Sequence, residues 1–132
     1  MIDHTYNTFA TQFPDGRITT STTNDLFSPG QDYRASRENR DKLGEVLTGD
    51  VAFALDQFGL IQSGQIPSHL KGRIDLSHVG VFGHSIGGAT AYDASYDPRI
   101  AVGINLDGGL YRLRDREGLR KPFFVHQLGK LF

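Results

Sequence analysis

The sequence predicts an α/β fold in which a mostly parallel sheet is flanked by helices. Three short apolar segments, at 79–82, 99–106 and 122–126, are typical of buried strands. A long amphipathic segment at 35–61 and a shorter one at 89–95 are typical of helices. A helix between the first two strands favours parallel pairing, because parallel neighbours need a crossover connection.

The first 34 residues are predicted to be mainly loop. Thr, Ser, Asn, Asp, Pro and Gly are dense here, and these residues favour turns for specific backbone reasons. Gly16–Thr20 is the one segment that we expect to form a strand or the arm of a hairpin.

The segment 35–61 is predicted to form a long helix that packs on the core. Its apolar residues recur every three or four positions, as on one helix face. They are Leu43, Leu47, Val51, Leu55 and Phe58, with Val46 and Ala54 widening the stripe. Gly44 and Gly49 each lower helix propensity by about 1 kcal/mol relative to Ala, so we expect a break or bend near 48–50. Charged residues at the start are expected on a solvated face: Arg37, Glu38, Arg40, Asp41 and Lys42.

Two connections complete the predicted order. Residues 63–77 contain Gly64, Pro67 and Gly72 and are expected to form a loop. Residues 110–120 are a charged connection into the last strand.

A Gly-x-Ser-x-Gly motif lies where the first strand should turn into the short helix. It comprises Gly83, His84, Ser85, Ile86 and Gly87. A strand–turn–helix context is what a nucleophile elbow requires, with the serine hydroxyl lifted above the end of the sheet. We expect the flanking residues to be glycine because a Cβ would clash there. The motif therefore predicts a serine hydrolase of the α/β-hydrolase type, the alternative being an ordinary turn that holds a serine.

An aspartate follows the next buried strand, at the same expected edge of the sheet. Asp107 begins an Asp-Gly-Gly turn directly after 99–106. Carboxyl ends of neighbouring parallel strands form the ligand crevice of such sheets. A carboxylate there can orient a histidine, as in a Ser-His-Asp triad. A turn aspartate that caps its own loop backbone fits the same position.

The composition excludes several other classes of function. Of 132 residues, 38% are hydrophobic and 22% are charged, and the net charge is −1, which argues against a nucleic-acid binder or a polybasic membrane binder. No apolar run approaches the roughly 20 residues of a transmembrane helix, and the N-terminal residues lack a signal-peptide pattern. There are no cysteines, and no histidine–carboxylate cluster suggests a metal site.

Several segments together resemble the platelet-activating-factor acetylhydrolase-like branch of the α/β hydrolases. They are 2–6, 13–17, 50–57, 73–90 and 103–108. The resemblance implies that Ser85 is the nucleophile, that Asp107 is the triad acid and that the Ile86 backbone N–H donates to the oxyanion. It implies hydrolysis of short or oxidised acyl esters, as in ether phospholipids with an sn-2 acetyl group. It implies no metal and no organic cofactor.

The chain departs from the pattern of this family at both ends. The strand and loop that supply a second oxyanion donor should precede residue 1, and the triad histidine should follow a strand beyond 122–125. We therefore expect one partial α/β-hydrolase domain over 1–132, without the first strands and the last strand, and an impaired activity. Only His126 follows Asp107. It is either a substitute base or a strand-end histidine with local hydrogen bonds.

The remaining histidines are weaker candidates. His84 is expected to make local contacts, and His69 and His78 are expected in surface loops. By the resemblance, His4 lies in a segment that approaches the site.

Two alternatives to the acetylhydrolase hypothesis stay open. One is an inactive fragment or pseudoenzyme that acts only through association with another chain. The other is an esterase related to cutinases or to dienelactone hydrolases. Uncovered sheet edges also predict self-association.

Overall fold

The computed structural model describes residues 2–7, 9–21, 33–110, 112 and 118–127, with the backbone alone for 33–36. The elements are, in order, β1 (Ala10–Gln12), β2 (Ile18–Thr20), α1 (Tyr33–Ser63), β3 (Val79–His84), α2 (Ile86–Ala94), β4 (Ile100–Leu106) and β5 (Phe123–His126). The predicted loop at 22–32 and most of the charged connection at 110–120 lie outside the described residues.

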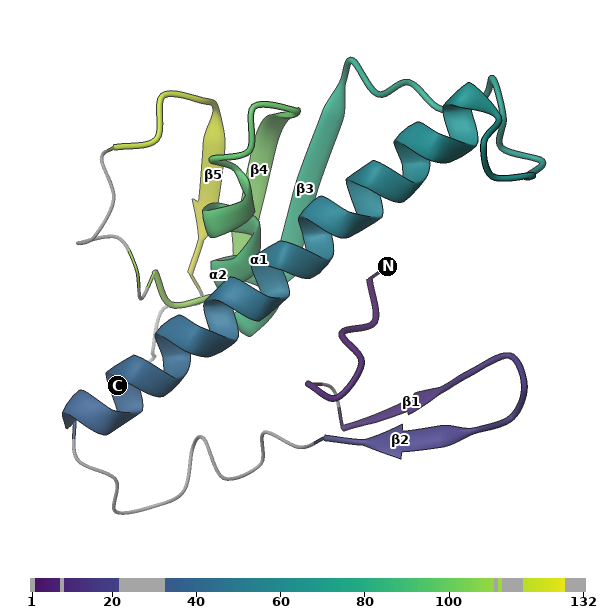
Figure 1. The fold of residues 1–132 in the computed structure, drawn as a ribbon. Coiled ribbons are helices and arrows are strands. Elements are labelled where there is room, and N and C mark those ends of the chain that lie inside the picture. Colours follow the sequence, from purple (N-terminus) through teal and green to yellow (C-terminus); the bar gives the residue numbers. More distant parts are fainter. Residues whose placement is uncertain (1, 8, 22–32, 111, 113–117, 128–132) are drawn as a thin grey trace.

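The central sheet contains three parallel strands in the order β3-β4-β5 (Figure 1). The register pairs Phe82 with Ile104 and Ile104 with Phe124, so equivalent residues form rows across the sheet. Helix α2 connects β3 to β4, which is the crossover that the sequence predicts. The predicted α/β class with a mostly parallel sheet is therefore confirmed.

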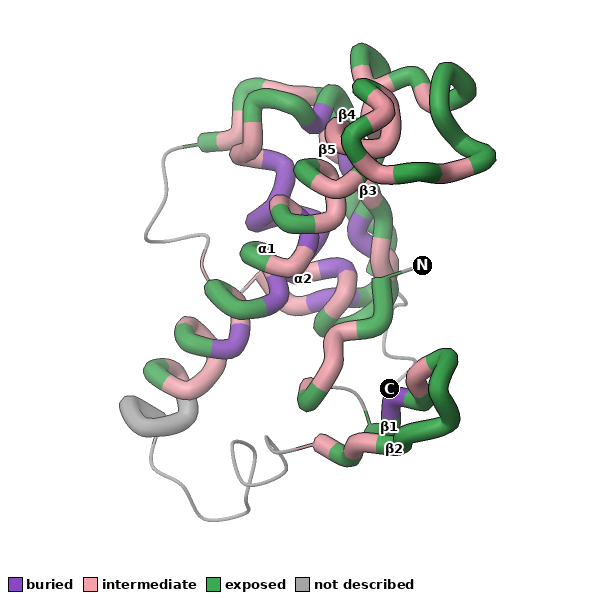
Figure 2. The backbone as a smooth tube through the Cα atoms, turned by 45° about the vertical axis from the view of Figure 1, so that its right-hand side comes forward, coloured by how far each residue is buried: buried purple, intermediate pink, exposed green. Residues whose placement is uncertain are grey.

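Both helices cover the same face of this sheet (Figure 1). Val51 of α1, Ala94 of α2 and Ile100 of β4 form a buried cluster, and Leu55 and Val79 pack against it. Figure 2 shows that buried residues line the inner sides of the helices and of the sheet. This layer fixes α2, and with it the turn that precedes α2, against the strand ends.

Helix α1 runs without a break through the two glycines where a break or bend was expected. Leu43, Leu47 and Val51 are buried along its inner face. Apolar packing of this kind outweighs the small propensity cost of a glycine. The buried face of α1 is narrower than the expected apolar stripe, because Val46 and Phe58 are 49% and 39% exposed.

The N-terminal segment forms a hairpin that only half matches the expectation. Strand β2 lies within the predicted arm Gly16–Thr20, but its antiparallel partner β1 was expected to be loop. A tight turn joins them, in which the Gly16 N–H donates to the Phe13 carbonyl and Gly16 has a φ of 85°. Strand β1 carries no alternating apolar pattern, which is why the sequence gives no signal for it.

The second face of the sheet is apolar and exposed. Its exposed apolar side chains are Phe82 (76%), Val102 (43%), Ile104 (38%) and Phe124 (59%), and we call these four residues the open face. Three of them form one row across β3, β4 and β5. Contiguous apolar surface of this kind marks an interaction site or an aggregation liability.

An ion-pair cluster joins the start of β4 to α1. The Arg99 guanidinium binds the Asp97 carboxylate at 2.6 Å and the Asp56 carboxylate at 2.5 Å. Its hydrogen bonds hold the pKa of Asp97 below the usual range.

Within the part of the chain that the structure describes, no helix has the length and apolarity to cross a bilayer.

Candidate active site

The predicted nucleophile Ser85 occupies the sharp turn between β3 and α2. Its backbone has φ 52° and ψ −121°, which is outside the regions that ordinary residues prefer. The Ser85 carbonyl accepts hydrogen bonds from Gly88 N–H and Ala89 N–H, so its main chain starts the helix. Its side chain makes no capping hydrogen bond. The exposed Ser85 hydroxyl is therefore free of the role that a serine at a helix N-terminus usually has.

The glycines around Ser85 differ in how closely they are packed. A Cβ at Gly83 would lie 2.2 Å from the carbonyl carbon and oxygen of Gly87, so the expected clash is confirmed there. The same expectation is wrong for Gly87, because a Cβ built there meets nothing within 4 Å. The crowded glycine on the helix side is instead Gly88, whose Cβ would lie 2.3 Å from Asn105 Oδ1.

Asp107 lies at the same edge of the sheet as Ser85, one strand away. His84 and Leu106, the last residues of β3 and β4, are paired in the register. The Ser85 N–H donates to the Leu106 carbonyl at 2.9 Å, and the Asp107 N–H donates to the His126 carbonyl at 2.7 Å. These bonds continue the sheet past the strand ends and bring the serine and the aspartate to one edge of the sheet.

Both predicted site residues have unusual backbone conformations. Among the described residues, the non-glycine residues with positive φ are Tyr6, Ser85 and Asp107, and Asp107 has a φ of 57°. Such conformations cost on the order of 1–3 kcal/mol each and cluster at functional sites, where the surrounding structure holds them. Two of these three residues are the ones selected from the sequence.

The turn that carries Asp107 is closed by Asn105, a residue that the sequence analysis missed. The Asn105 side chain is fully buried. Its Oδ1 accepts from the Gly108 N–H at 2.7 Å, and its Nδ2 donates to the Gly108 carbonyl at 2.9 Å. An amide residue within an otherwise apolar strand was the available signal, because a buried polar side chain needs a partner.

Ile86 is the first residue of α2, directly after Ser85. The first N–H groups of a helix have no partner within the helix and carry its positive dipole end. No hydrogen bond from the Ile86 N–H is found among the described residues. This donor is in the chain position that the predicted oxyanion role requires.

The five histidines all lie in the described residues, and none hydrogen-bonds to Ser85. The His126 ring stacks on Phe124 with centroids 6.5 Å apart. His4 Nδ1 lies 2.8 Å from the Asp50 carboxylate of α1. His69 and His84 are exposed, as is His78. The structure thus brings Ser85 and Asp107 to one edge, but it does not place a histidine side chain against the serine.

A second serine has histidine and aspartate neighbours in the loop before β3. The Ser77 hydroxyl contacts Asp75 Oδ1 at 2.5 Å and His78 Nδ1 at 2.9 Å, while His78 Nδ1 also contacts Asp75 Oδ2 at 2.8 Å. The hydrogen bonds from Ser77, and then from His78, lower the pKa of Asp75 to about 2. Both partners use the same ring nitrogen, so this exposed cluster cannot relay a proton from serine through the ring to the carboxylate.

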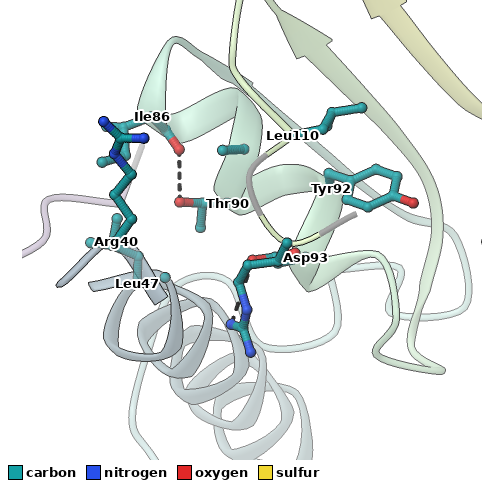
Figure 3. Close-up of a pocket in the computed structure, with 10 residues that line it drawn as sticks. Arg40, Leu47, Ile86, Thr90, Tyr92, Asp93 and Leu110 are labelled. Atoms are coloured by element: carbon teal, nitrogen blue, oxygen red, sulfur yellow. Dashed lines mark hydrogen bonds and ion pairs between the residues drawn. The ribbon is translucent and has the colours of Figure 1, made fainter. Parts of the chain in front are cut away.

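A small pocket of about 50 Å³ lies behind the elbow, between α1 and α2 (Figure 3). Arg40 and Leu47 of α1 face Thr90 and Asp93 of α2 across it. Arg112 pairs with the Asp93 carboxylate at 3.5 Å. Of the predicted site residues, Ile86 lines this pocket, whereas Ser85 and Asp107 do not. The described residues contain no group of three or more metal-ligating side chains.

A family model matches the part of the chain that contains the predicted site. The family model of platelet-activating factor acetylhydrolase, isoform II, matches residues 42–128, more than half of the chain. That range includes both Ser85 and Asp107. A search of curated proteins gave no match.

A solved structure resembles nearly all of the chain. It is the ferulic acid esterase from Streptomyces cinnamoneus, with 35% sequence identity and a TM-score of 0.61. The similarity covers 93% of the present chain and 32% of the esterase chain. The chain therefore spans about a third of the length of that esterase.

Proposed function

This chain belongs to the platelet-activating factor acetylhydrolase isoform II family, and from that premise we propose that it carries the nucleophile and the acid of a carboxylic ester hydrolase. Ser85 is the nucleophile, Asp107 is the triad acid and the Ile86 N–H is an oxyanion donor. In this proposal the three residues lie in one partial α/β-hydrolase domain, which residues 1–132 form.

The observation that carries this proposal is the backbone of Ser85. A serine held at φ 52° between a parallel strand and a helix, with a hydroxyl that does not cap the helix, has no evident structural purpose. Strain of this kind persists only where the surrounding structure imposes it, and it is typical of functional sites. At this turn the backbones of Gly83 and Gly87 lie so close together that a Cβ at Gly83 would be 2.2 Å from the Gly87 carbonyl carbon.

The reaction follows from these positions. The Ser85 oxygen attacks the ester carbonyl carbon while a base removes its proton, and the carbonyl oxygen becomes an anion facing the Ile86 N–H. The tetrahedral intermediate collapses, and the alkoxide leaves with the proton that the base returns. Water then attacks the carbonyl carbon of the acyl-serine while the base removes a proton from it. The second tetrahedral intermediate collapses, which releases the carboxylic acid and returns the proton to Ser85.

The reaction also needs a base, and within the described residues no histidine side chain hydrogen-bonds to Ser85 to serve as one. Asp107 orients an imidazole and stabilises the imidazolium in our proposal, as the acid of a triad does. Because triad members act as a unit, hydrolysis by these 132 residues is expected to be slower by orders of magnitude than by a complete site. Imidazole from solution can substitute for a missing histidine, and we expect it to accelerate the reaction.

The proposed substrates are esters with short or oxidised acyl groups, including phospholipids with an sn-2 acetyl group. Family membership favours this class. The esterase neighbour makes feruloyl esters the second class to test. Cutin-type polyesters and dienelactones complete the substrate panel. They test the alternative of an esterase related to cutinases or to dienelactone hydrolases.

Covalent labelling tests the proposed nucleophile. The chain is treated with a fluorophosphonate probe, with and without imidazole, and the adduct is located by fragmentation of the modified peptide. We expect one adduct at Ser85, formed faster with imidazole. The exposed Ser77 is the internal control, because His78 and Asp75 contact it in an arrangement without relay geometry. Labelling of Ser77 in place of Ser85, or of neither by a folded sample, contradicts the proposal and favours the inactive fragment.

We also propose that copies of the chain associate through the open face. Its row of Phe82, Ile104 and Phe124 carries no charge, so two copies meet without like-charge repulsion. Strand β3, which carries Phe82, is the border strand of the described sheet and has a hydrogen-bonding edge that no described strand pairs with. This edge offers a second copy another place to bind, within the plane of the sheet.

Light scattering measures this association. Phe82→Ser combined with Phe124→Ser is expected to shift the chain toward the monomer, because it removes the two most exposed side chains of the open face. Phe53→Ser is the matched control, since Phe53 is 63% exposed on α1, away from the sheet face. A monomeric parent chain, or an equal effect of the control, would count against the proposal.

A further inference from the structure

Asn105 joins the strand that precedes Asp107 to the residue that follows it. Its side chain has no exposed surface, and both of its polar atoms are used by Gly108. The oxygen faces a donor and the nitrogen faces an acceptor, so the orientation of the amide is fixed. Asp107 is the corner of the loop that these two bonds close, and its backbone is held at φ 57°.

The same amide also contacts the elbow. A Cβ at Gly88 would lie 2.3 Å from Asn105 Oδ1, and a Cβ at Gly108 would lie 2.7 Å from it. The Gly108 Cβ would also lie 2.3 Å from the Ser85 carbonyl oxygen. Two glycines therefore leave the space in which Asn105 sits between α2 and the turn. Movement of the amide would displace the turn relative to Ser85.

From this packing we infer that Asn105 is a positioning residue, which sets the place of the Asp107 carboxylate relative to Ser85. The inference rests on the proposed function, since it gives Asp107 the role of the triad acid. The carboxylate must reach the imidazole nitrogen remote from the serine, and a misplacement of about 1 Å can cost about 10²-fold in rate. The Asn105 amide prevents that misplacement by holding Gly108 through both a donor and an acceptor.

Asn105→Asp is the sharpest substitution because it preserves the shape. The second carboxylate oxygen would face the Gly108 carbonyl, so one hydrogen bond becomes a repulsion in a buried site. Asn105→Leu removes both bonds without adding charge, and it serves if the first variant does not fold. Ile104→Asp is the control, because it adds the same charge one residue away on the open face.

The rate test is a double-mutant cycle on fluorophosphonate labelling of Ser85 in the presence of imidazole. Asn105→Asp is expected to lower the rate at least about tenfold, and to have no further effect in the Asp107→Asn background. An unchanged rate, or an equal loss in both backgrounds, overturns the positioning role. If Asp107→Asn alone has no effect, the assigned acid fails, and that failure belongs to the proposed function.

Hydrogen exchange tests the placement of the turn without any reaction. In Asn105→Asp and Asn105→Leu, the Asp107 and Gly108 amides are expected to lose protection at least about tenfold, while the Ile104 amide keeps its own. The control Ile104→Asp is expected to leave both turn amides protected. Loss of protection across the whole sheet would show that Asn105 only stabilises the fold, and would overturn the inference.

Discussion

Ser85→Ala is expected to abolish labelling by fluorophosphonate and to reduce ester hydrolysis to the background rate of imidazole in solution. The nucleophile of a complete triad contributes up to about 10⁶-fold in kcat. Here the whole rate above background should vanish, because no other described serine has the elbow conformation. The measurements are the adduct mass and the initial rate on a short-acyl ester, each with and without imidazole.

Ser77→Ala is the matched control for this result. It removes a hydroxyl from the exposed cluster of Ser77, His78 and Asp75, and it should leave the labelling of Ser85 unchanged. Ser85→Ala should melt at the temperature of the parent chain, since the Ser85 side chain makes no capping bond. If Ser85→Ala retained the labelling and Ser77→Ala lost it, the nucleophile would be misassigned.

Gly83→Ala is expected to destabilise the chain and Gly87→Ala is not, although both change one motif glycine to alanine. The alanine Cβ at 83 would lie 2.2 Å from the Gly87 backbone, which cannot rotate away as a side chain can. Overpacking of this kind costs about 1–3 kcal/mol. The alanine at 87 meets nothing within 4 Å and gains about 1 kcal/mol of helix propensity over glycine.

Urea unfolding followed by circular dichroism measures both free energies of unfolding. The midpoint should fall for Gly83→Ala and stay equal or rise for Gly87→Ala. Labelling of Ser85 should also slow in Gly83→Ala, because relief of the clash moves α2 away from β3 and with it the serine. Equal destabilisation by both substitutions would mean that the packing at this turn is not as described.

The sequence was most informative where a pattern has one physical solution. Apolar segments separated by a helix pattern predicted the parallel pairing of β3 and β4, because parallel neighbours need a crossover. That pairing in turn predicted that Ser85 and Asp107 lie at one edge. The catalytic roles of these two residues and of Ile86 stay predictions.

Local propensity was least informative where tertiary contacts decide. Gly49 did not interrupt α1, since burial of Leu47 and Val51 outweighs one glycine. Strand β1 has no apolar alternation and owes its pairing to the turn before β2. The packing at Gly83, Gly88 and Asn105 depends on distances between segments, and no periodicity encodes such distances.

The contact between Asn105, Gly88 and Gly108 has a consequence for protein engineering. A Gly-x-Ser-x-Gly pentapeptide grafted onto the end of another strand would lack the neighbour that shapes it, because the crowding at Gly88 comes from the adjacent strand. The continuous stretch from Val79 to His126 keeps these neighbours together, with β3, α2, β4, the turn that carries Asp107 and the β5 carbonyl that its N–H binds. A designer who moves this stretch intact carries the buried amide along with the serine.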